Sequence, residues 1–130
     1  MNKTAYLLLR LAIGTSMLGH GLVRLPKLAG FSKWMVGSFA KSILPDGLVV
    51  PFSYALPFVE FIIGLLLLMG LFTKQSAIAG SLVMIILIFG STTIENWDVI
   101  PVQLMHVAFF AALIQFVQYN SYALGGVRGK

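Results

Sequence analysis

Long apolar runs alternate with short polar segments along this chain, and four of the runs have the length of a membrane span. They cover residues 5–23, 49–72, 75–92 and 101–119. About 20 apolar residues in an α-helix cross the hydrocarbon core of a bilayer. The pattern therefore predicts an all-α fold, an integral membrane four-helix bundle that forms a single domain over residues 1–130.

The segment 28–44, between the first two spans, has a different pattern. Aromatic and aliphatic side chains recur there at helical spacing, whereas lysines and serines fill the other positions. Such a helix is too short and too polar to span, and an amphipathic helix lying in the membrane interface fits it better. A loop packed over the bundle is the alternative. Pro-Asp-Gly at 45–47 predicts a turn before the second span.

The composition favours a bilayer over water as the solvent of this chain. Hydrophobic residues make up 58% of the sequence and charged residues 10%, and the mean hydropathy is +0.94. Soluble domains have about 25% charged residues. No basic patch interleaved with aromatics is evident, so the net charge of +5 indicates attraction to anionic lipid head groups. We therefore expect the lipid bilayer as a partner and no nucleic acid.

Four spans place both ends of the chain on one side of the membrane. The first span resembles a signal peptide, but no small-residue cleavage site follows it, so we expect it to stay as a helix. The positive-inside rule compares the numbers of lysines and arginines on the two sides of the membrane, and here the two numbers are equal. The terminal side carries Lys3, Lys74, Arg128 and Lys130, and the other side carries Arg24, Lys27, Lys33 and Lys41. We expect both termini in the cytoplasm.

Glu60 lies in the middle of the most apolar stretch of the chain, Pro51 to Phe72. A carboxylate near the centre of a span costs at least about 2.5 kcal/mol, so it normally faces a partner or a cavity. The first span carries Arg10 at an axial distance of about 9 Å from Glu60, at about 1.5 Å rise per residue. Glu60 is therefore expected to pair with Arg10, to hydrogen-bond towards His20, or to do each in turn. A structural ion pair and a ligand or proton site both stay open as interpretations.

Four glycines mark positions where the helices can approach closely. Gly14 and Gly21 lie on the same helix face of the first span as its two arginines. Gly64 lies one turn from Glu60 in the second span. The fourth belongs to a small-xxx-small pair in the third span. We expect helix packing at these positions: Gly14, Gly21, Gly64 and Gly80.

Two histidines extend the set of polar side chains within the spans. His106 lies with Gln103 on one face of the fourth span, and His20 lies towards the end of the first. Each is either a group that hydrogen-bonds between helices or a direct part of a site. The candidates for a polar cluster or ligand site are therefore Arg10, His20, Arg24, Glu60, Gln103 and His106. The spacing supports no metal site, and it assigns no catalytic residue.

Several short motifs resemble those of the DoxX/DoxD-like family of small bacterial membrane proteins. They are Arg-Leu-Ala-Ile-Gly at 10–14, His-Gly at 20–21, Lys27 after Leu-Pro, and the segment 60–74. The polar hallmarks of that family match Arg10, His20–Gly21 and Glu60, and its basic residue after the first span matches Lys27 or Arg24. The resemblance implies a four-helix protein of the bacterial inner membrane.

The family is named for its similarity to a subunit of a thiosulfate:quinone oxidoreductase, and some members associate with redox enzymes. We therefore predict an accessory subunit of a larger membrane complex, redox or envelope, that is not catalytic alone and has a membrane protein or a second copy as its partner. A buried Arg–Glu cluster would hold its bundle together. No resident cofactor is predicted.

The alternative is a protein that binds a quinone or a lipid near Arg10, His20 and Glu60. A quinone carbonyl needs a hydrogen-bond donor and its reduction needs protons, which a histidine can supply near neutral pH. The chain contains no cysteine, which excludes a dithiol mechanism and a thiolate-ligated iron–sulfur cluster within it. The electron donor would therefore be a partner protein. A transporter is less favoured, because no internal repeat is evident.

Overall fold

The computed structural model describes residues 1–126, so Arg128 and Lys130 of the charge comparison lie outside the described residues. Four helical stretches are long and apolar enough to cross a membrane. This confirms the predicted all-α class. The α-helices are α1 (Lys3–Arg24), α2 (Leu28–Ser38), α3 (Asp46–Met69), α4 (Thr73–Thr93) and α5 (Ile100–Gln115). Single 3-10 turns cover Leu25–Lys27, Trp97–Val99 and Val117–Tyr119.

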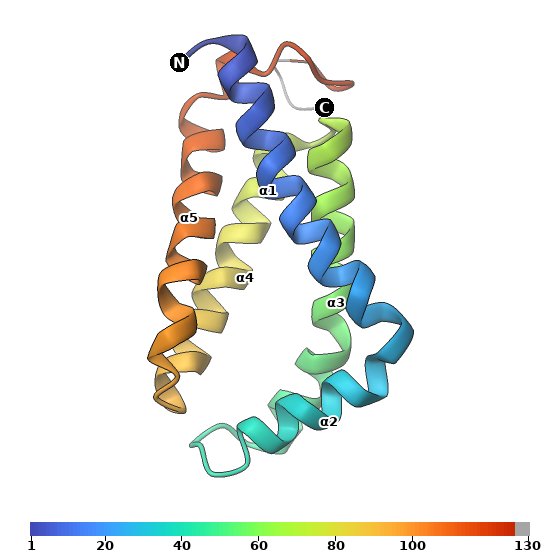
Figure 1. Cartoon of the computed structure of the whole chain (residues 1–130), viewed down its shortest axis with the longest axis vertical. Helices are drawn as coiled ribbons and strands as arrows, with labels where there is room; N and C mark the ends of the chain where they lie inside the picture. Colours follow the sequence, from blue (N-terminus) through green and yellow to red (C-terminus); the bar gives the residue numbers. More distant parts are fainter. Residues whose placement is uncertain (127–130) are drawn as a thin grey trace.

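The four long helices form two pairs, as Figure 1 shows. α1 packs along α3, and α4 packs along α5. α2 lies across one end of the bundle and packs against the first part of α3. The N-terminus and the segment after α5 lie together at the opposite end (Figure 1). The two ends of the bundle are therefore built differently, and the candidate site lies at the end that carries α2.

Helix ends follow from local chemistry. The Asn2 side chain accepts a hydrogen bond of 2.8 Å from the Ala5 amide and caps the first turn of α1. Gly70 ends α3 with a φ of 71°, in the left-handed region that favours glycine. α4 begins only three residues later, so α3 and α4 run antiparallel.

α1 and α3 are in contact at glycines. A Cβ at Gly21 would lie 2.6 Å from the backbone nitrogen of Phe61, and one at Gly64 would lie 2.6 Å from the Cα of Leu18. Real Cβ atoms essentially never approach other atoms so closely. The two backbones therefore touch here, and Gly14 continues the seam against Leu67. These contacts set the register of α1 on α3.

The second pair uses one glycine and one aromatic ring. The Phe110 ring of α5 is fully buried and packs on Gly80 of α4, where a Cβ would lie 2.7 Å from the ring carbon Cε2. Met17 and Leu67 complete the core on the side of the first pair. Each pair is thus held at one or more glycines, and the core lies where the pairs meet.

The helix predicted over 28–44 ends earlier, at Ser38. Residues 39–44 form turns instead, in which the Ser42 amide donates to the Phe39 carbonyl. Met35 is buried against α3, whereas Trp34 is 62% exposed and points away from the core. The expected single apolar face is therefore divided between the core and the outside. A location in the membrane interface stays a prediction.

Candidate functional site

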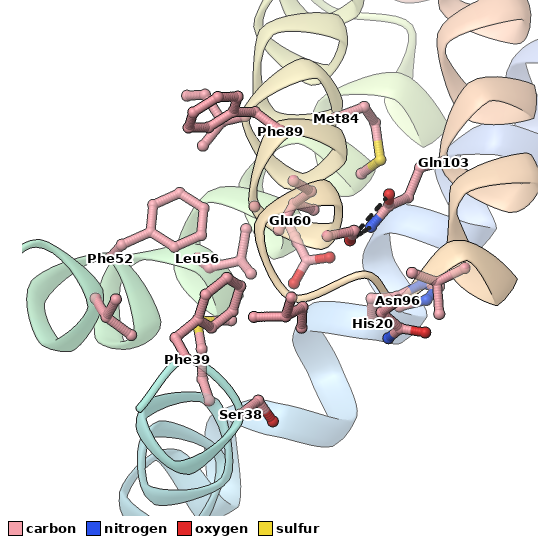
Figure 2. A pocket seen from close by; sticks show the side chains of 18 of the residues that line it. His20, Ser38, Phe39, Phe52, Leu56, Glu60, Met84, Phe89, Asn96 and Gln103 are labelled. Carbon is pink, nitrogen blue, oxygen red and sulfur yellow. Dashed lines mark hydrogen bonds between the residues drawn. The ribbon is translucent and has the colours of Figure 1, made fainter. Parts of the chain in front are cut away.

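A cavity of about 600 Å³ separates the α1–α3 pair from the α4–α5 pair at the end of the bundle that carries α2. Figure 2 shows side chains that line it, with apolar groups such as Phe52, Leu56 and Phe89 on one side and polar groups on the other. Pockets that hold small molecules typically measure about 300–1,000 Å³ and combine a mainly apolar lining with few polar groups. The polar side chains on its wall include His20, Arg24, Glu60, Gln103 and His106.

Glu60 forms an ion pair with Arg24 across this wall. The Arg24 Nη1 atom donates to Glu60 Oε1 at 2.7 Å. The Glu60 side chain is 2% exposed and that of Arg24 27%, so the carboxylate is the deeply buried partner. The Arg24 guanidinium also lies 4.5 Å from the centroid of the Phe31 ring. The α1–α3 seam brings the pair together, because it places the last turns of α1 beside Glu60.

The expected pair between Arg10 and Glu60 is wrong. The glycine seam places Leu18 level with Gly64, so Arg10 lies level with residues near Gly70. Ten residues of helix separate that level from Glu60, an axial distance of about 15 Å, which is beyond the reach of the two side chains. The first part of α3 runs past the end of α1 beside α2.

Arg10 instead joins the N-terminal half of α1 to the segment after α5. Its side chain is buried and donates to Asn120 Oδ1 at 2.7 Å and to the Tyr122 carbonyl at 2.8 Å. Asn120 in turn donates from Nδ2 to Thr73 Oγ1 at 3.0 Å, at the start of α4. The arginine of the family motif at 10–14 therefore lies in a network at the end of the bundle away from the cavity.

Replacing Asn120 with alanine is expected to free the segment that follows it. Arg10 would lose a charge-assisted hydrogen bond, which contributes about 1.5–3 kcal/mol. Hydrogen exchange of the Leu124 and Gly125 amides, which donate to carbonyls of Met69 and Gly70, would report the change. We expect both amides to exchange faster in Asn120→Ala.

Tyr122→Phe is the matched control for this experiment. Tyr122 contributes only its backbone carbonyl to Arg10, and its side chain is exposed. Its exchange rates should therefore match the wild type. Unchanged exchange in Asn120→Ala would show that the segment does not depend on the Arg10 network.

The two histidines lie together on the polar wall. Their ring centroids are 6.1 Å apart in an edge-to-face arrangement. His20 Nδ1 lies 2.6 Å from the Ser16 carbonyl, and His106 Nδ1 lies 2.8 Å from the Val102 carbonyl. A carbonyl only accepts, so each Nδ1 carries the proton. His106 Nε2 then accepts from the Ser16 hydroxyl at 2.9 Å in the neutral ring.

Gln103 is also engaged within the protein. It exchanges hydrogen bonds with Ser91 of α4, at 3.2 and 3.3 Å. Ser16, Ser91 and Asn120 were not among the sequence candidates. The available signal was that each is a hydrogen-bonding residue within or directly after an apolar segment, where such groups need partners. Within residues 1–126, no group of three or more His, Asp or Glu side chains is placed to hold a metal ion.

The structure thus divides the six candidates between two places. His20, Arg24, Glu60, Gln103 and His106 line the cavity, whereas Arg10 does not. The four packing glycines lie at helix contacts outside the lining. The arrangement offers a long apolar wall with a charged pair and an imidazole at its polar side, which suits an amphiphilic ligand.

Comparison with known proteins gives one family match. A family model described as DoxX matches residues 5–93, from the first turn of α1 to the end of α4, and so includes His20, Arg24 and Glu60 of the cavity lining. No curated protein and no solved structure matches the chain.

Proposed function

The chain belongs to the DoxX family, and we propose that this membrane protein binds a small amphiphile, a quinone or a lipid, in the cavity beside Glu60. The observation that carries the proposal is the cavity itself, about 600 Å³ in volume, in which apolar side chains lead to a buried ion pair. An apolar chain would lie along Phe52 and Phe89, and the polar head would lie near Glu60 and His20. Such a ligand would enter from the bilayer.

The proposal includes a partner. A bound quinone changes its redox state only when an electron donor reaches it, and this chain has no cysteine to serve as a thiol donor. We therefore place the protein as an accessory subunit, not catalytic alone, in a redox complex of the bacterial inner membrane, with both termini in the cytoplasm. Cross-linking in native membranes followed by identification of the linked proteins tests this part. Recovery of only second copies of this chain would contradict it.

The ligand itself is tested by filling the cavity. Leu87 of α4 lines the cavity and is partly buried between the two core clusters. We expect Leu87→Trp to lower the amount of quinone or lipid that remains bound after gentle purification, by about tenfold or more, because the indole occupies the ligand's space. Mass spectrometry of extracted small molecules, normalised to protein, measures it.

Leu82→Trp on the same helix is the matched control. Leu82 is 57% exposed and does not line the cavity. It should retain the wild-type amount of ligand. A wild-type protein that carries no amphiphile, or equal retention in both variants, would contradict the proposed function.

A further inference from the structure

We propose that the cavity selects a neutral amphiphile whose head group carries hydroxyl groups, in preference to one whose head carries only carbonyl or ether oxygens. This inference rests on the proposed function and adds the chemical class of the ligand. It follows from which polar atoms on the cavity wall are already engaged and which are free. Two of the free atoms are hydrogen-bond acceptors.

The first free acceptor belongs to Glu60. Its Oε1 atom accepts from Arg24, whereas Oε2 has no hydrogen-bond partner among residues 1–126. The side chain is 2% exposed and lines the cavity, in which Figure 2 shows the carboxylate among the labelled side chains. A carboxylate oxygen only accepts hydrogen bonds. A ligand atom that satisfies Oε2 must therefore carry a proton.

The second free acceptor belongs to His20. Its Nδ1 atom donates to the Ser16 carbonyl, so in the neutral ring the lone pair is on Nε2. Nε2 has no hydrogen-bond partner within the described part of the chain. His20 lines the cavity on the same wall as Glu60. A hydroxyl group satisfies this nitrogen, whereas a carbonyl would set one lone pair against another.

Several other polar groups on the wall are engaged. His106 uses both ring nitrogens, Gln103 is paired with Ser91, and the Ser38 hydroxyl donates to the Trp34 carbonyl. Asn96 and Asp98 also line the cavity without a side-chain hydrogen bond within residues 1–126. A carboxylate only accepts and an amide both donates and accepts, so both groups can bind a hydroxyl.

Arg24 retains N–H donors beyond the one that binds Glu60, and a hydroxyl oxygen accepts from these as well as a carbonyl does. A hydroxyl group can therefore accept from Arg24 and donate to Glu60 or His20. A cationic head gains less, because Arg24 already neutralises the Glu60 carboxylate.

Three probes that share one ring and one decyl chain test the selection: a hydroquinone, its dimethyl ether and the corresponding benzoquinone. Each is added to the protein in nanodiscs at the same mole fraction of lipid, without oxygen, and binding is measured by native mass spectrometry. We expect the hydroquinone to bind about tenfold more tightly than either other probe, as for one hydrogen bond to a charged or strongly accepting group.

Variants assign the preference to its atoms. Glu60→Gln and His20→Phe should each reduce the preference to about threefold or less, since each removes one acceptor. If Glu60→Gln fails to fold, His20→Phe still provides the test. His20 is exposed and hydrogen-bonds only within its own helix, so its substitution should not prevent folding. Tyr54→Phe on α3 is the control and should keep the preference, because Tyr54 is 42% exposed and does not line the cavity.

The outcomes separate this inference from the proposed function. Equal binding of the hydroquinone and either other probe, or tighter binding of the quinone, overturns the hydroxyl selection and leaves amphiphile binding intact. Failure of all three probes to bind overturns the hydroxyl selection, and it overturns the proposed function as well if the purified wild-type protein also carries no amphiphile. A preference that survives in Glu60→Gln and in His20→Phe alike also overturns the assignment.

Discussion

Replacing Arg24 with methionine is expected to lower the free energy of unfolding by about 3–5 kcal/mol. The substitution removes the only cation that contacts Glu60 within the described residues, and the carboxylate is 2% exposed. A charge buried without a partner is strongly unfavourable, and a membrane offers no water to replace the arginine. Denaturant titration in mixed micelles, followed by circular dichroism, measures the loss.

The reverse single substitution and the double substitution sharpen this prediction. Glu60→Met should cost less, because Arg24 is 27% exposed and its long side chain can extend towards water. The double variant with methionine at both positions should recover most of the loss, since no buried charge remains.

Lys27→Met is the matched control for the arginine substitution. Lys27 is an exposed cation near the end of α1 and forms no ion pair within residues 1–126. Its removal should change stability by less than about 0.5 kcal/mol. A double variant as unstable as Arg24→Met would contradict the account, because it would place the cost in something other than the uncompensated carboxylate.

Substitution of the seam glycines is expected to have a comparable effect. Gly64→Ala and Gly21→Ala each place a methyl group within 2.6 Å of backbone atoms of the neighbouring helix. Backbone atoms cannot swing aside as a flexible side chain does, so α1 and α3 must separate. We expect a loss of about 3 kcal/mol or more for each, at the upper end of overpacking effects. The same unfolding titration measures it.

Gly19→Ala is the control within α1. A Cβ at Gly19 would meet nothing within 4 Å, and alanine favours the helix over glycine by up to about 1 kcal/mol. This variant should be as stable as the wild type or slightly more stable. If Gly21→Ala behaved like Gly19→Ala, the close contact between the two helices would not exist in the membrane.

The fold could be predicted from the sequence because the bilayer imposes a length and a polarity on each helix. Four apolar runs define four spans, and the short gap between the runs 49–72 and 75–92 makes the second and third spans neighbours. In the structure this connection is residues 70–72, between α3 and α4. The segment 28–44 was harder to predict. Its helical spacing continues beyond Ser38, but turns replace the last part of the helix and Trp34 faces outward.

The sequence indicated five of the polar side chains that line the cavity, but not which of them pair. An acid within a span needs a cation, and both arginines of the first span were candidates. Which arginine pairs with Glu60 depends on the axial position of α3 relative to α1, and the contact between Gly64 and Leu18 fixes that position. Hydropathy locates a span within a few residues, and three residues of error displace a side chain by about 4.5 Å. The cavity depends on how the two helix pairs diverge, which no local pattern encodes.

The Arg10 network has a consequence for how the protein is made. Glu60 lies only 36 residues after Arg24, so that pair can form as soon as α3 enters the membrane. Asn120 and Tyr122 lie 110 and 112 residues after Arg10. Chains are synthesised from the N-terminus, so this guanidinium lacks these partners until α5 has left the ribosome. The two arginines of α1 thus mark an early and a late step of assembly.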